Sequence, residues 1–345
     1  MRGRLISGMA WLCMAVTPIA AEAQSEPRQI VAAEGENWVH QQVGLVLPDQ
    51  AAGSERHQIM DATDNELDVW AHYHHPEGDF VATIYTYRAA INDVPLWFDR
   101  ARIAIEQTLF PNQAGSTPEP VSFAPPGSGQ RTALRIAYDL PPDARLSSTA
   151  LAVLPLGDWL AKVRISSGKL TAAELNARLD AFIAAIGWPE VKEEGREPVA
   201  IQPCEKPLTF KPAKTVQTNM EQELLDMAFS RIGGHGLGSF CRDRQEGIQW
   251  GLYKSQGRQA GYVLALQDAG RAIGVARRLP VTPQSAGYFV HYFDVGELAA
   301  YPAFNRLPSP EQVIESIQRN TPVSKMSLTA TEMTVGVEGG RMEIK

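Results

Sequence analysis

The first half of the chain alternates stretches of two-residue hydrophobic periodicity with two stretches of helical periodicity. β-Branched and aromatic residues predict strands over residues 68–73 and 80–87, and the polar residues 75–79 between them predict a hairpin loop. The same alternation later in this half predicts strands over residues 131–139, 148–155 and 158–166. Together these strands predict an antiparallel sheet.

Two amphipathic helices accompany these strands. The first is predicted over residues 95–110, where apolar residues recur every four positions and Asp93 is placed to act as the N-cap. The second is predicted over residues 171–186, where Thr171 and Glu174 have the spacing of a capping box. Each helix should cover the sheet with its apolar face.

The second half of the chain, residues 213–345, follows a similar plan. Thr218 and Glu221 predict the cap of one helix, and Ser309 and Gln312 predict the cap of a shorter one that follows later. The alternating stretches predict strands over residues 248–253, 261–266, 272–276 and 287–294, and a closing hairpin over residues 331–338 and 341–345.

A proline-rich segment separates the two halves. Residues 189–212 contain five prolines, and an acidic run at residues 190–194 begins the segment. Prolines withhold backbone N–H groups from helices and sheets, and the charges are costly to bury, so this segment should be an extended linker. The sequence therefore predicts one domain over residues 30–188 and another over residues 213–345.

Both halves predict an α+β fold in which each domain is an antiparallel sheet covered by about two helices. In the first half the order is an early hairpin at residues 68–87, a helix at 95–110, strands at 133–166 and a final helix at 171–186. This order resembles that of the PsbP/Mog1-like α+β sandwich. The resemblance implies a binding or assembly module, because that family has no shared catalytic residues.

The first 23 residues have the pattern of an export signal. Arg2 and Arg4 precede an uncharged run at residues 5–21, and the Ala-Glu-Ala of residues 21–23 is a small-x-small cleavage site. An uncleaved anchor is the alternative, because a run of about 17 residues is near the minimum that spans a bilayer. Pro18 and the adjacent cleavage site favour removal. We therefore expect a periplasmic or secreted bacterial protein that does not insert into the membrane after cleavage.

The balance of acidic and basic residues indicates which classes of partner to expect. Removal of the 23 signal residues from 345 leaves 322, with 30 basic and 38 acidic side chains and a net charge of −8. A chain with no basic excess gains little from counterion release, so nucleic acid is not an expected partner. A chain of this length and hydrophobic content can form two globular domains. A protein partner in the cell envelope remains the expected class.

Two cysteines, Cys204 and Cys241, remain after the signal is removed. An even pair in an oxidising compartment predicts a disulfide, which would hold the end of the linker against the second domain. Two inert buried thiols, or one reactive cysteine, are the alternatives.

The glycine-rich residues 233–241 contain the candidate catalytic residues. If Cys241 were reduced, His235 or Arg242 could lower the pKa of its thiol, and Cys241 with His235 would form a nucleophile–base pair. The alternative is a helix C-cap followed by a loop that the disulfide holds in place. The glycine spacing matches no nucleotide-binding motif, and the sequence predicts no cofactor.

A histidine cluster is the candidate metal site. On a strand, His72 and His74 point to the same face, and Asp79 across the hairpin loop could supply a third ligand for Zn²⁺ or Cu²⁺. His75 adds a further imidazole next to them. The alternative is a polar hairpin tip on the solvated face of the sheet.

Three functional hypotheses follow from the sequence. The leading one is a non-catalytic binding or assembly accessory of the cell envelope, because nucleophile-elbow, zinc-protease, Cys-x-x-Cys and EF-hand motifs are all missing from the chain. The second is a hydrolase that uses His235 and a free Cys241. The third is a periplasmic metal-binding protein that uses His72, His74 and His75.

Overall fold

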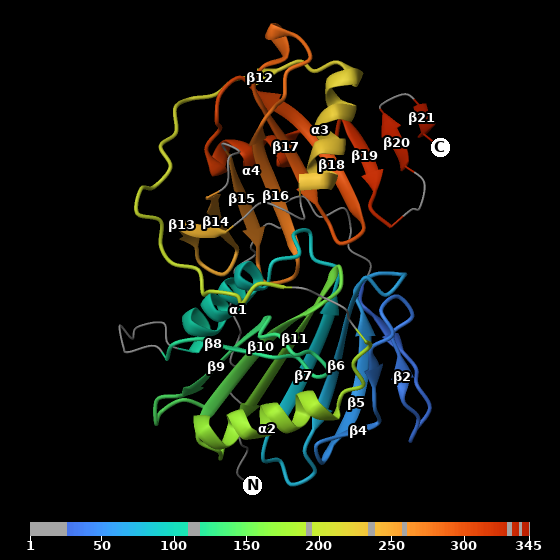
Figure 1. Ribbon diagram of the computed structural model, residues 1–345, viewed down its shortest axis with the longest axis vertical. Coiled ribbons are helices and arrows are strands. Elements are labelled where there is room, and N and C mark those ends of the chain that lie inside the picture. Colours follow the sequence, from blue (N-terminus) through green and yellow to red (C-terminus); the bar gives the residue numbers. More distant parts are fainter. Residues whose placement is uncertain are drawn as a thin grey trace, which may run out of the picture.

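The computed structural model describes residues 26–109, 118–190, 195–233, 239–256, 261–329, 333–337 and 340–344. In these residues the chain forms two large antiparallel sheets and four α-helices, with more strand than helix (Figure 1). The predicted mixed α+β class, built on antiparallel sheets, is confirmed. The export signal predicted over residues 1–23 lies outside the described residues.

The first sheet contains most of the predicted strands of the first half. Its strand order is β1-β5-β6-β7-β11-β10-β9-β8, with β4 beside β5, and β2 and β3 form a separate pair. The strands are β1 (Arg28–Ile30), β2 (Trp38–Val39), β3 (Val46–Leu47), β4 (Gln50–Ala51), β5 (Ser54–Asp61), β6 (Asp68–His74), β7 (Val81–Tyr87), β8 (Val121–Phe123), β9 (Ala133–Asp139), β10 (Ser148–Leu156) and β11 (Trp159–Ser167).

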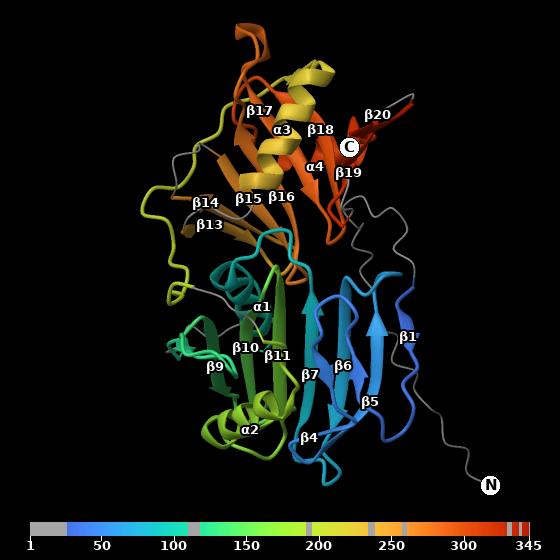
Figure 2. The same cartoon turned by 45° about the vertical axis from the view of Figure 1, so that its right-hand side comes forward.

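Helices α1 (Val94–Leu109) and α2 (Ala172–Ala185) cover opposite faces of this sheet (Figure 2). Alternate residues of β10 show the division, because Ala152 belongs to the core beneath α2 and Val153 to the core beneath α1. The capping box of Thr171 and Glu174 at the start of α2 is confirmed. Asp93 caps α1 as predicted, since its side chain accepts a hydrogen bond from the Leu96 backbone N–H.

The second sheet has the order β13-β14-β15-β16-β17-β18-β19-β20-β21, with β12 beside β18. Its helices α3 (Met220–Gly233) and α4 (Pro310–Arg319) pack on opposite faces, α4 against Val290 and α3 against His291. The strands are β12 (Thr215–Val216), β13 (Phe240–Glu246), β14 (Trp250–Ser255), β15 (Gly261–Leu266), β16 (Arg271–Arg277), β17 (Tyr288–Phe293), β18 (Glu297–Phe304), β19 (Ser324–Ser327), β20 (Met333–Val337) and β21 (Gly340–Ile344); a short 3-10 helix spans Pro283–Ser285.

The predicted cap of α3 was wrong by one residue. Asn219, not Thr218, accepts the hydrogen bond from the Gln222 backbone N–H, while the Thr218 hydroxyl accepts one from Arg278. The sequence offers two capping residues in succession, and the buried guanidinium of Arg278 takes the first of them. The cap of α4, formed by Ser309 and Gln312, is confirmed.

Helix α1 is buried between the two sheets. One hydrophobic cluster contains residues of α1 such as Trp97 and Ala101, residues of the first sheet such as Leu151, and residues of the second sheet such as Tyr253 and Val263. Charged residues of a helix normally face solvent, yet α1 also buries Asp99 and Arg100. Because both sheets share this cluster, the division into two domains stays a prediction.

A second contact between the sheets is the turn at residues 267–271, which we call the docking turn. Gly270 accepts a hydrogen bond from the Ala90 backbone N–H, at 2.7 Å from nitrogen to carbonyl oxygen. Asp268 lies 2.7 Å from the ammonium of Lys162, and Arg271 lies 3.0 Å from the carboxylate of Asp68. The docking turn therefore joins the second sheet to β6, to β11 and to the segment that follows β7 in the first.

Candidate functional site

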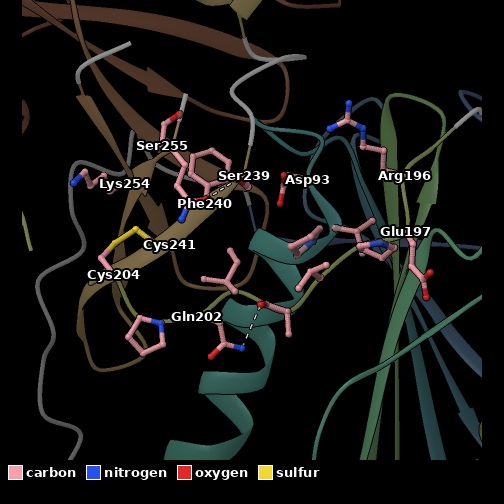
Figure 3. A pocket seen from close by; sticks show the side chains of 18 of the residues that line it. Asp93, Arg196, Glu197, Gln202, Cys204, Ser239, Phe240, Cys241, Lys254 and Ser255 are labelled. Carbon is pink, nitrogen blue, oxygen red and sulfur yellow. Dashed lines mark hydrogen bonds between the residues drawn. A yellow bond between two sulfur atoms is a disulfide. The ribbon is translucent and has the colours of Figure 1, made fainter. Parts of the chain in front are cut away.

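A cleft of about 1560 Å³ lies where the segment between the halves passes α1 and β13. Residues 195–206, which we call the connector, form one wall of this cleft. The residues just before and at the start of α1 form the floor, and the start of β13 with the end of β14 forms the other wall (Figure 3). A second cavity of about 320 Å³ is lined by Pro125, Pro126 and Trp188, among others.

The connector is an extended backbone that belongs to no helix or strand. Its Gly195 N–H donates to the Gln130 side chain, and at its other end the Gln202 carbonyl and the Cys204 N–H pair with the backbone of Arg242. Between these ends, the backbone N–H groups of residues 196, 197 and 199–201 donate no hydrogen bond to another residue that the structure describes. Val199 is 76% exposed, so the centre of the connector is open to solvent.

A disulfide holds one end of the connector on β13. The sulfur atoms of Cys204 and Cys241 are 1.97 Å apart, and both residues line the cleft (Figure 3). The main-chain pairing of Gln202 and Cys204 with Arg242 continues this attachment. The connector end therefore lies against the second sheet, as the pair Cys204 and Cys241 predicted.

Asp93 is the acidic residue on the floor of the cleft. Burial raises the pKa of its carboxyl group to about 6, although the hydrogen bond from the Leu96 N–H acts in the opposite direction. The carboxyl group thus changes its charge close to neutral pH. It offers a ligand either a hydrogen-bond donor or a negative charge, depending on pH.

Charges of both signs line the rest of the cleft. Arg196, Lys206 and Lys254 balance Asp93, Glu197 and Glu205, and the apolar lining comes from aliphatic side chains, prolines and Phe240. The ammonium of Lys254 donates to the carbonyl of Lys206 at 3.4 Å, which links the wall formed by β14 to the connector. With one aromatic ring in the described lining, the cleft offers little stacking surface for a sugar or a base.

The candidate catalytic pair is Cys241 with His235, and His235 lies outside the described residues. Cys241 is bonded to Cys204 and is 7% exposed, so it does not supply the free thiolate that a nucleophile requires. Arg242, the other candidate for activating Cys241, binds the carboxylate of Asp99 at 2.6 Å.

The candidate metal ligands separate into two groups. His72 and His74 lie on the same face of β6, as the alternation predicts, and the His74 ring stacks on that of His57 at 4.9 Å between centroids. Burial, together with the nearby His74 and His57, lowers the pKa of His72, whose Nδ1 lies 2.9 Å from the Thr83 hydroxyl. Asp79 lies instead with His75 and Glu77 in the hairpin loop.

One polar constellation was missed by the sequence analysis. The Ser230 hydroxyl lies 2.8 Å from His291 Nδ1, and His291 Nε2 lies 3.8 Å from Glu223, the order of groups found in a serine hydrolase. His291 is fully buried beneath α3, and neither of the two cavities described above reaches these residues. A substrate has no route to this serine through either cavity, so we assign the network to packing of α3 on the second sheet.

Arg278 accounts for much of that packing. Its guanidinium lies 2.7 Å from Asp226 and 3.4 Å from Glu223, and all three side chains are buried. Burial raises the pKa of Asp226, whereas the positive charge of Arg278 acts to lower it. The local sequence did not predict that the Arg278 side chain is buried, because its partners lie more than 50 positions away in the sequence.

Comparisons with known proteins give no family. No protein-family model matches the chain, and no curated protein matches it. A crystal structure from Bacteroides thetaiotaomicron is 13% identical over 70% of this chain and 89% of its own, with a TM-score of 0.21. None of the helices in the described residues is long and apolar enough to cross a membrane.

Proposed function

We propose that this protein is a non-catalytic binding module of the bacterial cell envelope and that the cleft beside the connector holds an extended peptide segment of an exported partner. The observation that carries this proposal is the largely solvent-accessible stretch of residues 196–200, which forms a wall of the cleft and in which the N–H groups of residues 196, 197, 199 and 200 donate to no described residue. An extended peptide can pair with such a backbone as an added strand.

The size of the cleft supports a peptide as the ligand. Small-molecule sites usually enclose about 300–1000 Å³, whereas this cleft has about 1560 Å³. Five extended residues span about 17 Å, which is enough to contact a ligand of similar length. The mixed charges and aliphatic side chains of the lining suit a peptide with alternating polar and apolar residues.

The experiment is a binding screen of the mature protein, residues 24–345, with its disulfide intact, against an array of ten-residue peptides. A bound peptide is then titrated by fluorescence anisotropy against Val199→Pro and Ala200→Pro. Each substitution removes one N–H from the connector and keeps its extended conformation. Successive N–H groups of an extended chain point in opposite directions, so we expect one of the two variants to bind at least tenfold more weakly.

Val199→Ala is the matched control, because it removes the exposed side chain and keeps the backbone N–H. It should bind like the unchanged protein. Equal binding by both proline variants and the control would reject strand addition on the connector. If no peptide binds while the purified protein turns over a substrate, the non-catalytic assignment is wrong.

A further inference from the structure

The hairpin loop between β6 and β7 brings three metal-binding side chains together. His75, Glu77 and Asp79 each offer a ligand atom, and these atoms all lie within 4.8 Å of one another. His75 Nδ1 lies 3.8 Å from the Asp79 carboxylate. One imidazole nitrogen and two carboxylate oxygens are ligands that Zn²⁺ accepts at its three-residue sites.

A cation already lies on two oxygens of this loop. The ammonium of Lys169, which follows β11, donates to the Glu77 carbonyl at 2.9 Å and to the Asp79 carboxylate at 3.1 Å. Two oxygen acceptors thus converge on one positive charge. The Lys169 side chain is 58% exposed, so it can turn into solvent, and a surface ion pair of this kind contributes about 0–1 kcal/mol.

The imidazole of the loop is held in place without a hydrogen bond at Nδ1. This nitrogen is buried and makes no hydrogen bond to a described residue, and the His75 ring packs against Phe80 at 5.0 Å between centroids. A buried polar atom without a partner is costly, and a bound metal ion would satisfy it. This atom lies on the side of the ring that faces Asp79.

Main-chain hydrogen bonds fix the loop itself. The Gly78 N–H donates to the His75 carbonyl, the His75 N–H donates to the Phe80 carbonyl, and the Ser167 hydroxyl at the end of β11 donates to the Asp79 carbonyl. The positions of His75 and Asp79 therefore depend little on whether a ligand is present. A site fixed in this way loses little entropy when an ion binds.

We propose that His75, Glu77 and Asp79 form a Zn²⁺ site in which Lys169 is a built-in competitor of the metal. When Zn²⁺ binds, the Lys169 ammonium leaves Asp79 and a water molecule completes the coordination. The site differs from the pair His72 and His74 on the strand, which does not include Asp79. It is also independent of the proposed peptide cleft.

The test is a calorimetric titration of the metal-free mature protein with Zn²⁺. We expect one ion per chain, with binding at least about tenfold weaker in His75→Ala and Asp79→Asn, since even outer-shell changes cost about 10–100-fold. Lys169→Ala should bind Zn²⁺ more tightly than the unchanged protein, because it removes the competing charge. A purely structural role of Lys169 would not produce tighter binding.

Two controls make the outcome decisive. Lys211→Ala removes an exposed lysine elsewhere and should leave the titration unchanged, as should His74→Ala on the neighbouring strand. Circular dichroism of every variant checks that it is folded. The proposal is overturned if the Zn²⁺ heat survives in the double variant His75→Ala/Asp79→Asn, if His74→Ala abolishes it, or if Ca²⁺ binds the loop as tightly as Zn²⁺.

Discussion

The docking turn and the connector both join the first sheet to the second, and they use their polar groups in opposite ways. The docking turn places Asp268 and Arg271 against Lys162 and Asp68, and of these four side chains Lys162, Arg271 and Asp68 are largely closed to water. The connector leaves residues 196–200 open to a cleft. Polar groups with partners fix the arrangement of the two sheets, and polar groups without partners remain available to a ligand.

The same contrast between groups with and without partners appears on α1. Outside the lining of the cleft, Asp99 of α1 accepts hydrogen bonds from Arg242 at 2.6 Å and from the Tyr253 hydroxyl at 2.8 Å. In the lining of the cleft, Asp93, the N-cap of the same helix, has one backbone partner among the described residues, and its pKa is raised. Asp99 on α1 therefore has several side-chain partners, whereas Asp93 at the N-cap has one backbone partner, and substitutions can test the two carboxylates separately.

The largest expected effect is loss of the disulfide that holds the connector. On the chain-entropy model, opening the loop between Cys204 and Cys241 costs about 3–4 kcal/mol of the free energy of unfolding. The double variant Cys204→Ser/Cys241→Ser should show this loss in urea denaturation. It should also weaken peptide binding, while any variant in the docking turn should leave peptide binding unchanged. A loss below about 1 kcal/mol would mean that the connector stays attached without the bond.

A loss of about 3 kcal/mol is expected for Asp99→Ala. This change leaves the guanidinium of Arg242 and the Tyr253 hydroxyl without their acceptor at a buried position. Urea denaturation measures the effect, and Asp143→Ala, at an exposed position, is the control that should change stability by less than about 0.5 kcal/mol. Equal stability of the two variants would show that α1 does not depend on this network.

The close approach of Gly270 to the first sheet can be isolated with a pair of substitutions. Gly270 has a φ of +78°, and an added Cβ would lie 2.6 Å from a ring carbon of Tyr87. Gly127 has a φ of +76° with nothing within 4 Å of such a Cβ. Alanine at either position incurs about 1 kcal/mol of backbone strain, so we expect Gly270→Ala to lose about 1–2 kcal/mol more than Gly127→Ala. Equal losses in thermal unfolding would place Tyr87 away from the turn.

The smallest effect is the pH dependence from Asp93. Its pKa is about 6 in the folded protein and 3.8 for the ordinary group, so the folded state binds the proton more tightly. The resulting stabilisation is complete below about pH 4 and is lost as the pH rises through 6. Because the side chain is partly open to the cleft, we expect a change of about 1 kcal/mol, less than the full shift would give. Asp93→Asn keeps the cap and should remove this slope between pH 4 and 6.5; an unchanged slope would assign it to another group.

Local patterns predicted the elements that carry clear periodicity or caps. The strands at 68–73 and 80–87 and the helix capped by Thr171 correspond to β6, β7 and α2 with small changes at their ends. Strands β5, β13 and β18 were not predicted. β5 and β13 are rich in charged residues because they lie towards the edges of their sheets, and β18 contains Pro302 within its run.

The sites depended on contacts that no local pattern contains. The cleft forms because the connector passes the start of α1. Asp268, which pairs with Lys162, and Arg242, which pairs with Asp99, each lie more than 100 positions from their partner. The hairpin loop was predicted, but its internal geometry was not. The turn at Gly78 brings His75 and Asp79 close together, and the sequence pattern does not contain that contact. The disulfide was the exception, because an even number of cysteines in an expected oxidising compartment predicted it without knowledge of their positions in space.

The disulfide also gives the chain a covalent topology. The bond closes a ring that runs from Cys204 to Cys241, and α3 lies entirely inside this ring. A protease that cuts the backbone once within the ring leaves both pieces attached through sulfur. The nicked protein would migrate as one chain on a non-reducing gel and as two after reduction. After one cut beside α3, the helix would therefore lose its backbone connection on one side, and the rest of the ring, including the disulfide, would still join it to the second sheet.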